Sequence, residues 1–372
     1  MSSWWCYRGD PQRSGANVAG TPTRDPRREI RWSVNVINGH PLENGLRSDP
    51  RGHIYVGRSD GLSVLDQRGK QVWRYTDVTP ECGLFVREGV VLAGHDGIHI
   101  VRNGEKQVEV ETNLRKTLDC GGALLPFLLE DFGYIESAQG SDSMEFCAWP
   151  KDGGFAARAH RSLSADNEDF FLTVQRIIPP LVHGIYFRYD SRATTASIGR
   201  LTHDKPVYPS EDMRQGFGEP IVHSDGTLFV TEYDPASTTI HQFCRLTRIQ
   251  GNETGLRSER IDDHSYFAPP PVVTKNDVYY IKPGKILAKR TIGGGESWET
   301  SLDDYIDNRV SMIRVVGDIV YIVSDRTLVG FEEFGENVFS LSFDYKIKSV
   351  IGTGNGVYVA TTNSVFAFTD TD

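Results

Sequence analysis

The sequence has few cysteines and no long apolar run, and these absences exclude several classes of protein. Its five cysteines are scattered and form no C-x-x-C pair, so neither a zinc knuckle nor a redox pair is predicted. No stretch approaches roughly 18 consecutive apolar residues, which excludes a membrane-spanning helix. The first eight residues have neither a basic nor an apolar segment of the kind that a secretory signal needs. We therefore expect a cytoplasmic protein with reduced, mostly buried thiols.

Positive charge is also scarce, because 40 Lys and Arg face 50 Asp and Glu, for a net charge of −10. This balance opposes general binding to nucleic-acid phosphates, and we expect neither a nucleic-acid nor a membrane partner. Aromatic residues make up 10% of the 372 residues, which argues against disorder. The chain is therefore expected to fold around a large core without metal or cofactor.

One short unit recurs along the chain. It consists of a turn with Gly or Asp, a β-branched and aromatic strand, a second turn and a second strand, often followed by a third strand after Gly. Eight copies follow one another at spacings of roughly 36 to 51 residues, which is typical of a propeller blade. The clear copies begin at residues 51, 88, 276, 317 and 355, and the weaker ones at 132, 183 and 225.

Period-2 alternation within these copies predicts strands, and no window shows a capped helical stripe. We therefore expect an all-β fold, an eight-bladed β-propeller of four-stranded antiparallel blades. The last copy ends after three strands, and an orphan strand at 29–36 precedes the first copy. Pairing that N-terminal strand with the C-terminal three closes the last blade. Residues 1–28 are then an arm that packs on a single propeller domain of residues 29–372.

Four aromatic residues occupy one equivalent place on the predicted outer strands, namely Trp32, Trp73, Trp298 and Phe339. Large aromatic side chains bury much apolar area. We interpret them as packing wedges between blades.

Residues 5–15, which read Trp-Cys-Tyr-Arg-Gly-Asp-Pro-Gln-Arg-Ser-Gly, and the later Ile30-Arg-Trp32 resemble the opening of the pyrroloquinoline-quinone-like (PQQ-like) β-propeller repeat proteins. The repeats resemble that family's Asp-Gly-x-Val-Tyr-Val-Gly and Gly-x-x-x-Trp phrases, most clearly at residues 4–75 and 270–369. The resemblance implies the fold. The family's quinone-dependent dehydrogenases carry adjacent cysteines, which this chain lacks, so no cofactor is expected. The family's outer-membrane assembly lipoprotein is a scaffold that binds partners, and this chain resembles it but lacks its lipoprotein signal.

In a propeller, the loops that lead into each innermost strand share one face with the turns between second and third strands, and partners usually meet that face. Arginines and phenols expected there can hold a protein partner or a polar small molecule at the channel mouth. The predicted ligand-binding residues are Arg58, His95, Arg188, Tyr189, Arg214, Tyr233 and Arg309. His95 and His99 do not predict a metal site, because His99 falls in the next strand.

Two functions remain open. The first is a soluble binding module that presents the channel mouth to a protein or small-molecule partner. The alternative is a cofactor-independent biosynthetic enzyme, a lyase, isomerase or cyclase, that uses acid and base groups at the mouth. His264, Tyr266 and Glu219 are the candidate catalytic residues, since neighbouring blades bring them to that face.

Overall fold

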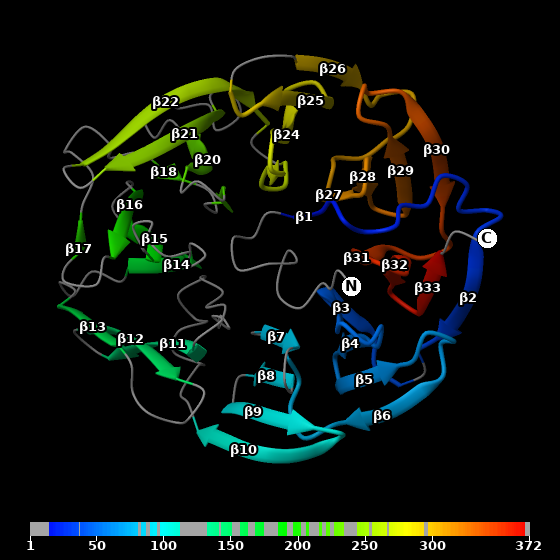
Figure 1. Cartoon of the computed structure of the whole chain (residues 1–372), viewed down its shortest axis with the longest axis horizontal. Coiled ribbons are helices and arrows are strands. Elements are labelled where there is room, and N and C mark those ends of the chain that lie inside the picture. The colour runs from blue at the N-terminus through cyan, green and yellow to red at the C-terminus, as the bar shows by residue number, and fades with distance from the viewer. Residues whose placement is uncertain are drawn as a thin grey trace. The chain divides into compact units, whose positions relative to one another are not determined.

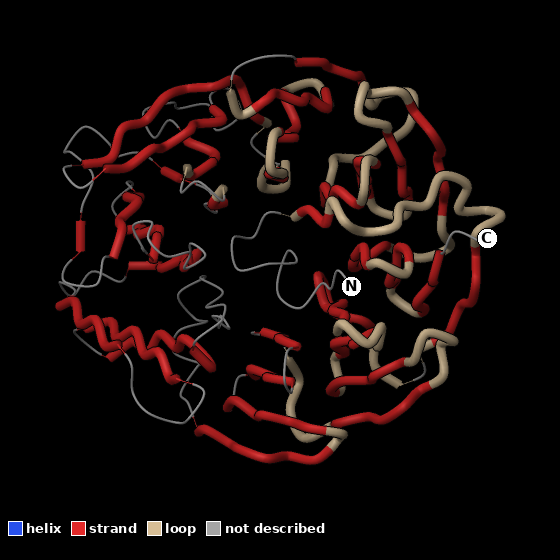
Figure 2. Tube along the Cα trace, viewed as in Figure 1, coloured by secondary structure: helices blue, strands red, loops and turns tan. Residues whose placement is uncertain are grey.

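A computed structural model shows that the described part of the chain consists of strands and loops (Figure 2). Within these residues no helix occurs, as the period-2 alternation predicts. The described residues are 15–36, 38–80, 83–86, 90–94, 97–111, 132–140, 143–150, 157–162, 168–174, 185–191, 196–201, 206–207, 216–217, 221–223, 227–233, 244–252, 255–265, 268–293 and 297–368.

The chain divides into two compact units. Unit 1 comprises Met1–Asp10, Gly15–Val110 and Phe267–Asp372, and unit 2 comprises Pro11–Ser14 and Glu111–Tyr266. The expectation of one domain over residues 29–372 stays a prediction.

In its described residues, unit 1 contains five sheets, in which strands that follow one another along the chain pair antiparallel. Three of them are made of four strands each: β3 (Pro41–Ser48), β4 (Ile54–Arg58), β5 (Gly61–Leu65) and β6 (Gln71–Tyr75); β7 (Gly83–Val86), β8 (Val90–Gly94), β9 (Gly97–Arg102) and β10 (Glu105–Glu111), whose last residue belongs to unit 2; and β23 (Val272–Val273), β24 (Asp277–Lys282), β25 (Ile286–Thr291) and β26 (Ser297–Ser301).

The fourth sheet joins the two ends of the chain. β2 (Ile30–Asn35) pairs antiparallel with β33 (Ser364–Phe368), and β32 (Gly356–Thr361) and β31 (Ile347–Thr353) follow (Figure 1). The predicted pairing of the orphan N-terminal strand with the C-terminal three is therefore confirmed. β2 supplies hydrogen-bond partners to an edge that the C-terminal strands alone would leave open.

The fifth sheet departs from the expected four antiparallel strands. β27 (Met312–Val316), β28 (Ile319–Ser324), β29 (Thr327–Phe331) and β30 (Asn337–Ser342) form an antiparallel set, and β1 (Ala16–Asn17) adds a fifth, parallel strand beside β27. The Val315 and Gly317 amides donate to the Gly15 and Asn17 carbonyls at 3.1 and 3.0 Å. The difference arises because the N-terminal residues satisfy backbone groups at the free edge of β27.

Where the structure describes unit 2, three further sheets are defined by their backbone pairing. They are β11 (Phe132–Gly140), β12 (Ser143–Pro150) and β13 (Ala157–Ser162); β14 (Glu168–Val174), β15 (Ile185–Ser191), β16 (Ala196–Leu201) and β17 (Pro206–Val207); and β18 (Gly216–Phe217), β20 (Leu228–Tyr233), β21 (Cys244–Asn252) and β22 (Gly255–His264), with β19 (Ile221–Val222) beside β20.

The core of unit 1 lies on both faces of its middle strands. Every residue of β4, β28 and β32 is buried, because neighbouring sheets pack against the two faces. The outer strands β2, β6 and β26 instead alternate or expose their residues. A buried strand reads as a continuous apolar run, and an edge strand alternates.

Two of the outer-strand aromatics, Trp32 and Trp298, bond to the following sheet, as the repeat predicts. Trp32 and Trp298 donate from their indole nitrogens to the carbonyls of Gln67 and Glu333, which lie in a turn of the following sheet. Trp73 packs edge-to-face on Tyr55. Phe339 packs on Tyr321. The two tryptophan hydrogen bonds therefore join sheet to sheet within unit 1, whereas the Trp73 and Phe339 ring contacts lie within one sheet.

Candidate functional site

Loops and turns of unit 1 gather at one end of its sheets. The turn between second and third strands is bonded to the loop that leads into the next sheet: the Leu302 amide donates to the Lys285 carbonyl at 3.0 Å, and the Ile347 amide to the Asp325 carbonyl at 2.8 Å. We call this surface of unit 1, formed by those loops and turns, the loop face. The expected neighbourhood of the two kinds of loop is therefore present there.

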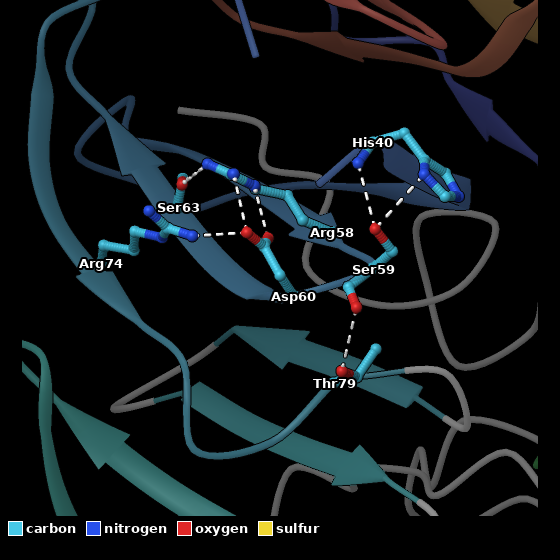
Figure 3. Close-up of polar contacts among 7 residues, drawn as sticks. All are labelled: His40, Arg58, Ser59, Asp60, Ser63, Arg74 and Thr79. Carbon is cyan, nitrogen blue, oxygen red and sulfur yellow. Dashed lines mark hydrogen bonds and ion pairs between the residues drawn. The ribbon is translucent and has the colours of Figure 1, made fainter. Parts of the chain in front are cut away.

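One predicted ligand-binding residue, Arg58, is the centre of a polar network on the loop face (Figure 3). Arg58 ends β4, and its side chain is 5% exposed. Its guanidinium pairs with Asp60 at 3.0 Å between Nε and Oδ1, and it donates to Ser63 Oγ at 2.7 Å. Arg74 of β6 pairs with the other oxygen of the same carboxylate. Asp60 is thus shared by two cations.

The loop before β3 closes over this network. Gly39 has a φ of +85°, and a Cβ there would lie 2.2 Å from Asp60 Oδ1, so only glycine fits. His40 follows, and its backbone amide donates to Ser59 Oγ at 3.1 Å, while Thr79 donates to the Ser59 carbonyl at 3.3 Å. Figure 3 shows His40 and Thr79 on either side of Ser59. The turn is therefore held by the loop before β3 and by the loop that leads into the next sheet.

Burial lowers the pKa of the Arg58 guanidinium, Asp60 opposes that shift, and the Arg74 cation adds to it. These contacts hold Arg58 on Asp60 and Ser63, whereas His40 is exposed on the same surface. In this arrangement Arg58 acts as a scaffold for the turn. Its role as a ligand clamp stays a prediction.

Arg309 and His264 are the other two predicted site residues whose side chains the structure describes. Arg309 is exposed on the loop that leads into β27, where the repeat predicts it. His264 ends β22 and is 2% exposed, so it lies in a buried strand position and not at an exposed rim. Its Nδ1 lies 2.9 Å from the Ser265 carbonyl, and burial lowers the pKa of His264 to about 4. This imidazole is neutral near pH 7.

Three further predicted residues are placed by their backbone alone. Arg188 and Tyr189 were expected in a turn but lie within β15, opposite Phe171 and Phe170 of β14. Tyr233 ends β20 and pairs with Gly216 and Cys244. The alternating Ile185–Ser191 segment continues as a strand because its β-branched and aromatic residues favour pairing. Tyr266, Glu219, His95 and Arg214 lie outside the described residues.

A second charged cluster stands on the first strands of neighbouring sheets, and none of the predicted ligand-binding residues belongs to it. Glu43 on β3 pairs with Lys346 and Lys348, whose Nζ atoms lie 3.1 and 3.3 Å from its Oε1. Arg314 of β27 donates to Asn44 Oδ1 at 2.8 Å. Arg47 of β3 donates to the Asn44 carbonyl. A charged residue inside an otherwise buried strand, as in Leu46-Arg47-Ser48, is the signal that would have found Arg47 and Arg314.

This cluster keeps Glu43 ionised. Although partial burial acts in the opposite direction, hydrogen bonds from Lys346 and Lys348 hold the pKa of Glu43 below its ordinary value. Lys346 and Glu43 are exposed, whereas Arg47 and Arg314, which bind Asn44, are buried. The cluster therefore offers cationic groups at a partly open surface.

Metal and membrane features do not arise among the residues described. No group of three or more His, Cys, Asp and Glu side chains there is placed to hold a metal ion. In the same residues no helix has the length and apolarity to cross a membrane.

Comparison with known proteins identifies the fold through structure and not through sequence. No protein-family model matches the chain, and no curated sequence matches it. BamB from Moraxella catarrhalis is similar with a TM-score of 0.54 and 12% identity, over 92% of this chain and 98% of that one. Quinohemoprotein alcohol dehydrogenase from Comamonas testosteroni is similar with a TM-score of 0.61 and 11% identity, over 99% and 80%. The WD40 domain of SCAP from fission yeast is similar with a TM-score of 0.56 and 8% identity, over 91% and 98%.

At identities this low, the likeness concerns the fold alone. The first two structures are PQQ-type propellers, and WD40 domains are propellers too. The chain therefore has an all-β fold of the propeller type.

Proposed function

We propose that this chain is a binding module of the PQQ-like propeller family, with eight blades that each correspond to one of the described sheets. In this arrangement the first strands line the central channel, and the loop face surrounds its mouth. A protein or polar small molecule binds at that face. We also propose that the protein works in the cytoplasm.

The observation that carries this proposal is the rigid presentation of charge on the loop face. Arg58, Asp60 and Arg74 are locked to one another, and neighbouring turns are tied to the next sheet by backbone hydrogen bonds. Arg326 and Tyr345 are exposed on such a bonded turn and on the loop that it contacts. Preorganised side chains lose little conformational freedom on binding, which favours affinity.

The test is affinity capture with the full-length protein, comparing two matched double variants. Arg326→Glu with Tyr345→Ser alters the loop face, and Arg68→Glu with Val72→Ser alters a turn and an outer strand away from it. A partner should be captured by the wild type and by the second variant, and lost with the first. Equal capture by both variants, or loss with both, would contradict the proposed face.

The candidate enzyme has no comparable support in the described residues, since His264 is buried and its two proposed partners are not described. It stays a prediction of the sequence.

A further inference from the structure

We propose that the cluster around Glu43 is a recognition site for an acidic segment of a protein partner. This inference rests on the proposed function and specifies the chemistry of the partner. Its basis is the convergence of four cationic side chains on two adjacent residues of β3.

The backbone brings these residues together through bulges in two first strands. Along β3 the chain advances from Pro41 to Leu46 while its partner residue on β4 moves only from Arg58 to Val56. Between Ile347 and Ser349 of β31 the register also shifts, which leaves Lys348 as the extra residue. Bulges bend a strand and redirect its side chains, and they are over-represented beside functional sites. Here the two bulges meet, since Lys348 contacts Glu43.

Four cationic groups reach the β3 bulge. Lys346 and Lys348 bind the Glu43 carboxylate, Arg47 binds the Asn44 carbonyl, and Arg314 binds the Asn44 side-chain oxygen. Asn44 itself has a φ of +51°, the left-handed conformation that asparagine tolerates. Lys346 directly precedes β31, and the other three cations lie within first strands of unit 1. They stand in a chain whose net charge is −10.

Glu43 shows which ligand chemistry the two lysines accept. It is a carboxylate carried by an extended segment of peptide, 62% exposed, and it bridges two ammonium groups. Exposed ion pairs of this kind contribute little to stability, so exchanging Glu43 for another carboxylate costs little. A partner segment rich in Asp or Glu presents the same group in the same covalent setting. The buried Arg47 and Arg314, which bind the neighbouring Asn44, add a positive potential that attracts such a segment.

The experiment uses the full-length protein and two fluorescein-labelled peptides, hexaglutamate and hexaglutamine, in fluorescence anisotropy at about 50 mM salt, where screening is weak. The wild type should bind hexaglutamate and not hexaglutamine. Lys346→Gln with Lys348→Gln should weaken hexaglutamate binding by about tenfold or more. Arg68→Gln with Lys70→Gln removes the same charge from an exposed turn at the opposite end of a sheet and should leave binding unchanged.

Glu43→Gln separates recognition from a structural role. It removes the internal carboxylate that competes with the peptide, so the affinity for hexaglutamate should rise by about threefold to tenfold while the thermal midpoint barely moves. Weaker binding in Glu43→Gln would overturn the proposal. An equal loss of hexaglutamate binding in the Lys346 and Lys348 variant and in the Arg68 and Lys70 control would also overturn it, because that result would indicate general charge attraction.

Two further outcomes distinguish this inference from the proposed function. If citrate binds with the same dependence on Lys346 and Lys348 and hexaglutamate does not, the site takes small carboxylates and the peptide proposal is wrong. If a partner is captured at the loop face but its capture is insensitive to Lys346 and Lys348, the binding module stands and this inference falls. If neither peptide nor partner binds, both fall.

Discussion

Trp32 on the outer strand β2 donates a 2.8 Å hydrogen bond from its indole nitrogen to the backbone carbonyl of Gln67, in the turn between β5 and β6. The two residues belong to different sheets of unit 1. The ring also packs on Tyr358, with 6.0 Å between ring centroids. One side chain thus ties its own sheet and the next one together.

Replacing Trp32 by Phe should keep most of the apolar contact and remove the hydrogen bond. We expect a loss of about 1 kcal/mol in the free energy of unfolding, because the Gln67 carbonyl at this partly exposed site can bond to water instead. Urea denaturation followed by circular dichroism measures it. Trp298→Phe should behave alike, since Trp298 donates to Glu333 in the equivalent turn. An unchanged midpoint in both variants would show that the bond contributes nothing.

The turn under the indole should tolerate no side chain. Gly69 has a φ of +78°, and a Cβ there would lie 2.8 Å from the Trp32 ring. Gly284 has a φ of +80°, and a Cβ there would meet nothing within 4 Å, so it is a matched control. Gly69→Ala should cost about 1–3 kcal/mol more than Gly284→Ala, because both pay the backbone penalty and only the first displaces a ring. Equal unfolding midpoints would contradict this packing.

The position of these aromatics could be read from the sequence, because each follows the same spacing within a repeat. Trp32 and Trp298 face a turn that offers a carbonyl. Phe339 stands before the sheet whose outer strand, β2, comes from the other end of the chain, so no turn joins β33 to β2. A residue without an N–H donor occurs where the topology provides no such turn. The pairing of β2 with β33 could also be predicted from the repeat, because the last copy has only three strands and one strand before the first copy has no partner.

Other features depended on contacts that no local pattern encodes. Residues 16–17 have no strand signal, and β1 exists because the edge of β27 has backbone groups to satisfy. The bulges of β3 and β31 bring Glu43 to Lys348, although the two residues are far apart in the sequence. Arg58 is a predicted ligand-binding residue, and its contacts with Asp60 and Ser63 could not be read from the sequence. Loop positions could therefore be predicted, whereas the partners of their side chains could not.

Tyr321 should hold the N-terminal segment onto unit 1. Its hydroxyl accepts from the Thr23 amide at 2.7 Å and donates to the Thr23 carbonyl at 3.2 Å, and both residues are fully buried. Tyr321→Phe leaves a buried amide without its acceptor, which costs about 1–3 kcal/mol. Hydrogen exchange should accelerate in residues 20–25. Tyr345→Phe, at an exposed tyrosine, should change neither stability nor exchange, and unaltered exchange in Tyr321→Phe would contradict the anchoring role.

His264 should make stability fall in mild acid. Burial lowers its pKa in the folded protein to about 4, whereas the unfolded chain has the ordinary value near 6.5. Between these two values the unfolded chain binds a proton that the folded protein does not, so the stabilisation is complete above about pH 6.5 and is lost as the pH falls toward 4. The slope from this group is at most about 1.4 kcal/mol per pH unit.

Urea denaturation of the wild type and of His264→Gln at several pH values from 7 to 4.5 measures this dependence of stability on pH. The substitution lowers stability at every pH by disturbing the core, but it should also flatten the dependence on pH in this window. Parallel curves for the two proteins would show that His264 takes up its proton without unfolding, and that its burial in β22 does not control the acid response.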